Sequence, residues 1–235
     1  LMRVPGVAQP WISTFHSFCE RVLRDHGIAI GIPNRFEILD TTGVWHLIYE
    51  HFEEFDLDYY RPRGNPTQFL QAMISHFSRA KDEAISPQEY LEYAESVCLN
   101  SDNVEFEEEG KRLSEMANAY HTYNRILLEH NKLDFGDMLM YVYELLRTRP
   151  AVAKELQKKF KYILVDEFQD TNWIQYAIVK ALGGDGNSLT VVADDDQSIY
   201  KFRGASVSNV MEFVRYFPNR ETVSLTHNYR SCQEI

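Results

Sequence analysis

The chain has 235 residues, of which 44% are hydrophobic and 13% aromatic, and its formal net charge is −11. This composition is typical of a folded globular protein, because a disordered chain lacks the apolar surface needed for a core. The acidic balance argues against bulk electrostatic attraction to nucleic acid. It does not exclude a narrow groove that contacts a few phosphates.

No apolar run approaches the roughly 20 residues that a membrane-spanning helix needs. Residues 1–6 also lack the long apolar core of a signal peptide. The three cysteines, Cys19, Cys98 and Cys232, are scattered without metal-site spacing, as in proteins of a reducing compartment. We therefore expect an intracellular protein that does not enter a membrane. The abrupt first and last residues predict a fragment of a larger protein.

The first 40 residues mix strand and helix patterns. Residues 11–15 favour a short strand. Residues 15–26 carry apolar side chains at helical spacing, and Gly27 favours the end of that helix. Residues 28–40 have no clear period.

Residues 41–131 have only helical patterns. Residues 44–55 are one candidate, and Asn65 followed by proline predicts the start of another. Residues 86–89 form a capping box, and an apolar stripe over residues 113–127 predicts a long helix. We expect an all-helical insertion over residues 41–131.

Helix and strand patterns alternate after Asp134. The expected helices cover residues 135–146, 173–182 and 207–217, and the expected strands cover 162–166, 189–193 and 222–225. This order implies βαβ units and a parallel sheet. The fold class is therefore α/β, with the helical segment inserted in it.

The candidate chemistry starts where the apolar run of residues 162–165 meets two adjacent acids, Asp166 and Glu167. The run predicts a buried parallel strand. Ligands of open α/β sheets bind at the carboxyl ends of the strands. There, one acid can hold a divalent metal while its neighbour acts on a water molecule.

The two following strands also end in polar residues, over 194–198 and 228–231. Strand ends of one parallel sheet share an edge, so Asp166, Glu167, Gln197 and Arg230 are expected to converge on one ligand. A metal-binding acid, an acid for water, an amide and an arginine are the groups that phosphoryl transfer requires. Each feature alone has an ordinary explanation as a solvated turn or a surface ion pair, but their joint appearance favours function.

These residues resemble a known family. Residues 166–172 resemble motif II of the UvrD/Rep-type superfamily 1 helicases, residues 193–205 are similar to motif III, and residues 228–231 look like motif IV. Residues 14–18 resemble motif Ib, and residues 133–139 match a further signature. The resemblance covers essentially the whole chain. It implies an incomplete RecA-like domain of the P-loop NTPase type.

The resemblance implies roles at the nucleotide. Asp166 would help to hold Mg²⁺, and Glu167 would orient and deprotonate the attacking water. Gln197 would couple the γ-phosphate of ATP to the DNA site. Arg230 would contact the γ-phosphate, and Tyr229 would stack on the adenine.

The resemblance also implies DNA contacts. Tyr200, Phe202 and Arg203 would line the single-strand channel, and Thr14 and His16 would contact the DNA backbone. Independently of the family, aromatic side chains interleaved with basic ones offer stacking faces worth about 1–3 kcal/mol per base. Core packing of the aromatic residues and a helix-start role for the histidine stay open.

The sequence departs from the family pattern in several ways. It contains no Gly-x-x-x-x-Gly-Lys-Ser/Thr phosphate loop, and motifs V and VI are missing. Ala193 stands where the family usually has glycine, and Phe202 where many members have tryptophan. Because the phosphate loop supplies much of the nucleotide affinity, we expect the isolated chain neither to bind ATP tightly nor to unwind DNA.

The resemblance thus implies a fragment of an ATP-dependent DNA helicase, which we expect in the cytoplasm and associated with the nucleoid. Its cofactors would be ATP and Mg²⁺, and its partners single-stranded DNA or a single-strand/duplex junction and the remaining helicase domains. Residues 1–40 and 132–235 would form two parts of the first motor domain, ending at the junction to a second one. Residues 41–131 would form the helical subdomain. The resemblance implies 3′-to-5′ polarity.

Two alternatives stay open. A metal-dependent nuclease would use Asp166, Glu167 and residues 194–196 as a carboxylate cluster. A non-catalytic module would bind single-stranded DNA or dock a partner, with the helical insertion as its working surface.

Overall fold

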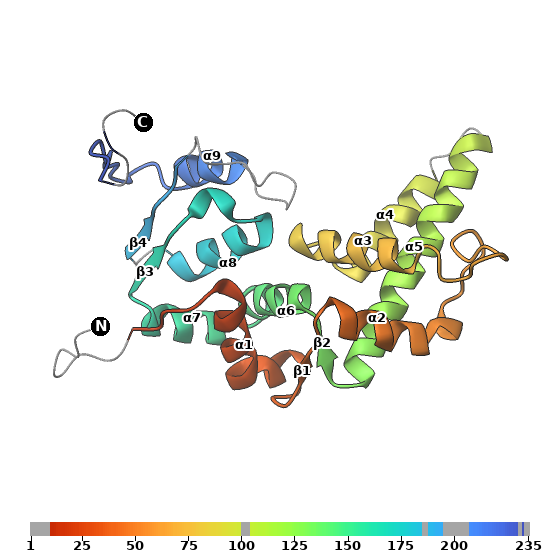
Figure 1. Ribbon diagram of the computed structural model, residues 1–235. Coiled ribbons are helices and arrows are strands. Elements are labelled where there is room, and N and C mark those ends of the chain that lie inside the picture. Colours follow the sequence, from red (N-terminus) through yellow and green to blue (C-terminus); the bar gives the residue numbers. More distant parts are fainter. Residues whose placement is uncertain (1–9, 100–103, 185–187, 195–206, 230–231, 233–235) are drawn as a thin grey trace.

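The computed structural model describes residues 10–99, 104–184, 188–194, 207–229 and 232, and Figure 1 shows their arrangement. Helices make up most of this described chain, and its strands pair two by two. No helix within the described ranges is long and apolar enough to cross a membrane.

The first helix, α1 (Phe15–His26), confirms the helical pattern. It begins after Thr14, whose Oγ1 accepts a hydrogen bond of 3.3 Å from the Ser17 N–H. This N-cap satisfies one of the free donors of the first turn. The helix is followed by the 3₁₀ turn η1 (Gly27–Ile30), and Gly31 reverses the chain with a φ of 87°.

The strand expected over residues 11–15 is wrong. Residues 10–14 have no regular structure. The Trp11 ring packs edge-on against Phe18 and Phe160, with 4.9 Å between the Trp11 and Phe160 ring centroids. Trp11 is thus covered by side chains of α1 and of the segment before β3, and it needs no strand partner.

Two short strands, one before and one after the long helical segment, pair with each other. β1 (Glu37–Ile38) pairs in parallel with β2 (Lys132–Leu133), and the Leu39 N–H continues the pairing with a bond of 2.8 Å to the Leu133 carbonyl. The described elements between them are all helical. The chain therefore enters and leaves the helical segment at the same place (Figure 1).

The helical pattern of residues 41–131 is confirmed as secondary structure. The elements there are α2 (Thr41–Glu50), η2 (Phe52–Glu54), α3 (Leu70–Asp82), α4 (Pro87–Leu99) and α5 (Val104–Glu129). The capping box before α4 is also confirmed, because the Glu89 carboxylate accepts the Ser86 N–H at 2.9 Å and the Ser86 hydroxyl accepts the Glu89 N–H at 3.1 Å.

Two predicted helix starts are displaced. α2 begins at Thr41 rather than residue 44, because the Asp40 carboxylate caps the Gly43 N–H at 2.7 Å. The start expected at Asn65 is wrong. Residues 66–69 form turns and α3 begins only at Leu70.

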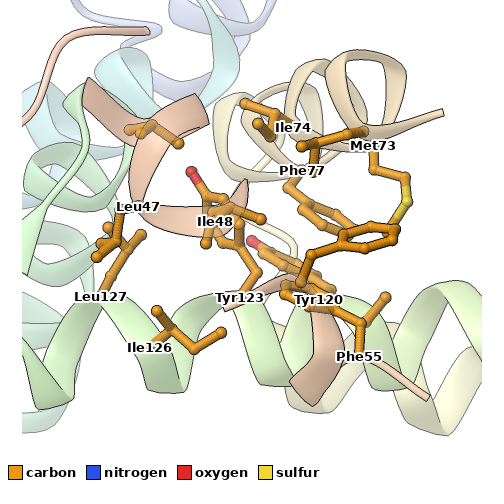
Figure 2. Packing of buried hydrophobic residues seen from close by; sticks show 14 of the residues in the cluster. Leu47, Ile48, Phe55, Met73, Ile74, Phe77, Tyr120, Tyr123, Ile126 and Leu127 are labelled. Carbon is orange, nitrogen blue, oxygen red and sulfur yellow. The ribbon is translucent and has the colours of Figure 1, made fainter. Parts of the chain in front are cut away.

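These helices share a core of their own. Its buried residues all lie between Leu39 and Leu127. Figure 2 shows side chains of α2, α3 and α5 meeting there. The Phe77 and Tyr120 rings stack at 4.8 Å between centroids, tilted by 8°, which adds to the free energy gained from burying both rings.

The rest of the chain alternates helices and strands as expected. Its elements are α6 (Phe135–Thr148), α7 (Pro150–Lys159), β3 (Tyr162–Val165), η3 (Phe168–Asp170), α8 (Trp173–Gly183), β4 (Ser188–Val191) and α9 (Val207–Tyr216). β3 and β4 pair in parallel, with Val165 opposite Val191. Helix α6 contacts α1, α3 and α8, so it lies between the helical segment and the β3–β4 sheet (Figure 1).

Two predictions about the strands are wrong. β3 is not buried, because Tyr162 is 84% exposed and Leu164 71% exposed. Only the alternate residues Ile163 and Val165 pack against the hydrophobic clusters, since the described sheet has two strands and its helices cover one face. The expected strand over residues 222–225 does not form. Its backbone has no paired strand among the described residues, and a lone extended segment has no ladder to stabilise it.

Candidate functional site

The candidate site lies at the carboxyl edge of β3 and β4. Both strands point the same way, so the residues that follow them share this edge. Backbone hydrogen bonds extend the pairing past the strand ends: the Val192 N–H donates to the Val165 carbonyl at 2.9 Å, and the Phe168 N–H to the Val192 carbonyl at 2.8 Å. Asp166 and Glu167 are therefore held next to residues 192–194.

Glu167 has an unusual backbone. Its φ is 51° and its ψ 44°, a left-handed conformation that costs a residue with a side chain about 1–3 kcal/mol. Phe168, directly after it, is fully buried and packs edge-on against Tyr176 and Phe213. The buried ring anchors the turn. The side chains of Asp166 and Glu167 face solvent above it.

Gln169 connects the two strand ends. Its side chain is only 1% exposed. Its Nε2 donates a hydrogen bond of 2.7 Å to Glu167 Oε2, and its Oε1 accepts one of 3.1 Å from the Asp194 N–H. The sequence analysis includes Gln169 in the motif at residues 166–172 but predicts no role for it. The available signal was an amide two residues after a strand-end acid.

The end of this segment is tied to three helices. The Asn172 side chain caps α8 by accepting the Gln175 N–H at 3.0 Å, and it donates a hydrogen bond of 2.6 Å to Asp82 at the end of α3. From α9, the Asn209 amide donates to the Thr171 carbonyl at 2.9 Å. Burial, with the nearby Glu83 carboxylate, raises the pKa of Asp82 to about 6, and the Asn172 hydrogen bond opposes the rise.

A buried charge cluster lies beside this junction. Lys81 Nζ is 2.6 Å from Asp134 Oδ2 and 2.6 Å from Asp137 Oδ1, and the Tyr123 hydroxyl donates to Asp134 Oδ2 at 2.6 Å. Gly136 packs against the Lys81 side chain, and a Cβ there would lie 2.9 Å from its Cδ. The cluster joins α3 and α5 to the start of α6.

The pKa values of the cluster reflect one cation facing two carboxylates. Burial opposes the charge on Lys81, but Asp134 and Asp137 outweigh it and raise the pKa of the lysine. Burial and the charge of Asp134 raise the pKa of Asp137 to about 7. Sequence reasoning found the motif at residues 133–139 but not its lysine partner, which lies 53 residues before Asp134.

A cavity of about 1070 Å³ opens where α3, α6 and the segment after Glu167 meet. Its lining includes His16, Ser75, Arg79, Asp82, Asn172 and Gln175. Burial lowers the pKa of His16, whose ring packs edge-on against Phe135 at 5.5 Å between centroids. His16 thus faces this cavity, while the Thr14 hydroxyl is used in the cap of α1.

Residues 2–218 match the family model described as the UvrD/REP helicase N-terminal domain. The chain belongs to this family. The resemblance found from the motifs is therefore confirmed, and the carboxylate pair after β3 lies within the matched region of a UvrD/REP helicase N-terminal domain.

Similar curated proteins agree. The chain is 38% identical over 232 residues to the ATP-dependent DNA helicase PcrA of Bacillus subtilis (strain 168), covering 98% of this chain and 29% of that protein. It is 36% identical to PcrA of Leuconostoc citreum, covering 96% and 27%. It is 33% identical to a probable DNA helicase II homolog of Mycoplasma capricolum, covering 96% and 29%. The chain spans less than a third of the length of these relatives.

Several expected site residues of this UvrD/REP domain lie outside the described residues. They are Gln197, Tyr200, Phe202, Arg203 and Arg230. Tyr229 is described, and its ring is 93% exposed and stacked on His227 at 6.2 Å between centroids. The described structure brings Asp166 and Glu167 together with Asp194 at one edge. The convergence of Gln197 and Arg230 on that edge stays a prediction.

Proposed function

We propose that this chain is part of the motor of an ATP-dependent DNA helicase, which couples ATP hydrolysis to 3′-to-5′ movement along single-stranded DNA. The observation that carries the proposal is the solvent-facing pair Asp166 and Glu167 at the carboxyl edge of two parallel strands, in a chain of the UvrD/REP family. Relatives that align with nearly the whole chain bear the name ATP-dependent DNA helicase.

Glu167 is the general base in this proposal. Its left-handed backbone presents the carboxylate to solvent at the sheet edge, where a bound water can donate to it. Only one of its two oxygens bonds to Gln169. The other can orient a water for attack on the γ-phosphate and accept its proton. A positioned base of this kind contributes about 10²–10⁴-fold to a rate.

Asp166 suits a magnesium site. Mg²⁺ keeps several waters and binds one or two carboxylates together with substrate phosphates, and Asp166 is an exposed carboxylate at the strand end. When bound, the ion would neutralise charge on the phosphates. Gln197 and Arg230 would face the γ-phosphate, and Tyr229 would stack on the adenine.

We further propose that residues 1–40 and 132–235 belong to one RecA-like motor domain and that residues 41–131 form a helical subdomain inserted in it. The β1–β2 pairing at the ends of the helical segment supports this division, as does the separate core between Leu39 and Leu127. The second motor domain would come from the rest of the intact protein.

DNA would contact Thr14 and His16 at the start of α1, and the resemblance adds residues 200–203, which lie outside the described residues. Because burial lowers the pKa of His16, the neutral imidazole would contact the DNA backbone through a hydrogen bond rather than by charge. A single strand or a single-strand/duplex junction is the proposed substrate, and a cytoplasmic, nucleoid-associated location follows from it.

Two other functions make different predictions. A metal-dependent nuclease would cut DNA with Mg²⁺ or Mn²⁺ and without ATP. It would need Asp195 and Asp196, which lie outside the described residues. A non-catalytic binding module would bind single strands in a salt-sensitive way and ignore nucleotide. The nuclease leaves Gln197 and Arg230 without a role, and the non-catalytic module gives no role to Glu167, which is held in a costly backbone conformation at the sheet edge.

The test uses the intact protein that carries this chain. We expect single-stranded DNA to stimulate ATP hydrolysis, and we expect a duplex with a 3′ tail, but not one with a 5′ tail, to be unwound. DNA cleavage without ATP would favour the nuclease, and DNA binding without ATP hydrolysis would favour the module. In a parallel titration, the 235-residue chain alone should bind ATP weakly, with a Kd above the micromolar range, because its sequence contains no phosphate loop.

A further inference from the structure

We propose that Gln169 is a positioning residue for Glu167, holding its carboxylate in place from the backbone at the end of β4. The inference rests on the proposed function, because it concerns the same attacking water. The side chain bridges two segments that the sheet brings side by side: it donates to Glu167 Oε2 at 2.7 Å and accepts from the Asp194 N–H at 3.1 Å.

The burial of Gln169 makes the bridge specific. The side chain is 1% exposed, so water cannot replace a lost partner, and a buried amide without partners costs about 1–3 kcal/mol. Both ends of the amide are used, the nitrogen by a carboxylate and the oxygen by a backbone N–H. The amide group therefore has one favourable orientation, and that orientation fixes the position of Glu167 Oε2.

Glu167 needs such a support. An exposed glutamate has three freely rotating bonds, and a water-activating carboxylate must be held within a fraction of an ångström of its productive place. Its backbone is fixed by the turn into η3, but the backbone alone leaves the side chain free. Among the described residues, Gln169 is the side chain that hydrogen-bonds to this carboxylate.

The hydrogen bond between Gln169 and the Asp194 N–H has a second consequence. Asp194 is the last described residue before the segment 195–206, which includes the expected DNA contacts at Tyr200, Phe202 and Arg203. Gln169 therefore links the proposed general base to the backbone that precedes residues 195–206. A displacement of that backbone would pass to Glu167 through one buried side chain.

Gln169→Glu tests the bridge selectively. Glutamate has nearly the same shape and still accepts the Asp194 N–H, but it cannot donate to Glu167 and brings a second carboxylate against it. In the intact protein with saturating single-stranded DNA, we expect kcat for ATP hydrolysis to fall about 10- to 100-fold, with KM for ATP within threefold of the unaltered protein. Gln68→Glu, an exposed change elsewhere, is the matched control and should leave both unchanged.

A double variant that exchanges the two side chains, Glu167→Gln with Gln169→Glu, separates a loss of positioning from misfolding. Gln169→Glu should lower the midpoint of thermal unfolding, and adding Glu167→Gln should restore it, because the pair is again one amide and one carboxylate with donor and acceptor exchanged. The double variant stays inactive, since it has no base. If Gln169→Glu does not fold, folding of the double variant supports the contact and failure to fold refutes it.

The outcomes separate this inference from the proposed function. If Glu167→Gln alone loses hydrolysis while Gln169→Glu keeps the kcat of the unaltered protein, Gln169 does not position the base and only this inference is overturned. This inference is also overturned if the double variant is no more stable than Gln169→Glu alone. If Glu167→Gln retains full hydrolysis, the proposed role of Glu167 fails and this inference falls with it.

Discussion

Asn172 and Asp82 are joined by a hydrogen bond of 2.6 Å between the Asn172 Nδ2 and the Asp82 Oδ1. The bond connects the segment that starts at Glu167 to the last residue of α3, 90 positions earlier in the chain. Since α3 belongs to the helical segment 41–131, the two regions meet within a few residues of the candidate base. Changes at this junction should therefore alter stability without touching the nucleotide.

Asn172→Ala removes two contacts at once, the cap of α8 and the bond to Asp82. Loss of an asparagine N-cap costs about 0.5–2 kcal/mol, so the Tm of the transition that includes this domain should fall. Calorimetry of the intact protein checks this. The exposed Asn219→Ala serves as the control, and an unchanged Tm for Asn172→Ala would show that the junction adds nothing.

Lys81→Met should be among the most destabilising substitutions in the chain. It leaves Asp134 and Asp137 buried without their cation, and removing one partner of a buried ion pair costs about 3–5 kcal/mol. Chemical denaturation followed by tryptophan fluorescence measures the loss. Lys154→Met, on the exposed face of α7, should have little effect. A similarly small effect of Lys81→Met would mean that the cluster does not hold α3 against α6.

Asp82→Asn tests the electrostatics of the junction through pH. The pKa of Asp82 is raised from 3.8 to about 6 in the folded protein, so the folded state keeps a proton that the unfolded state releases. Ionisation of Asp82 therefore lowers the free energy of unfolding as pH rises from about 4 to about 6. Above that range the free energy of unfolding is lowered by the full amount. Asp82→Asn does not titrate and still accepts the Asn172 bond. It should raise Tm at pH 8 and lose that advantage by pH 4.

The control for this experiment is Asp25→Asn, an exposed change on α1. Its difference from the unaltered protein should be the same at pH 4 and pH 8. If Asp82→Asn showed a constant difference as well, or a larger advantage at pH 4, the burial of Asp82 would not govern its ionisation.

Much of the local structure could be predicted from the sequence. Helical spacing predicted α1, and the Ser86–Glu89 capping box predicted the start of α4, because both signals depend on residues a few positions apart. Strands were harder to predict. Residues 162–165 formed the expected β3 but not a buried one, and residues 222–225 formed none, because a strand is stabilised by neighbours that local sequence does not contain.

The site was predicted in part for a similar reason. Asp166 and Glu167 could be read from a strand followed by acids. The partner of that strand end could not, since the contact of Gln169 with Asp194 crosses 25 positions. The lysine of the neighbouring charge cluster was missed for the same reason, because Lys81 and Asp134 are 53 positions apart. The division into motor domain and helical insertion stays a proposal, although the helices themselves are confirmed.

The most direct test of the account is ATP hydrolysis by the intact protein with Glu167→Gln, measured with saturating single-stranded DNA. The substitution keeps the size of the side chain and removes the base. We predict that kcat falls by at least about a hundredfold, while DNA affinity at fixed salt stays within a few fold. Hydrolysis at the rate of the unaltered protein would contradict the account, because the carboxylate at the edge of β3 would then take no part in the reaction.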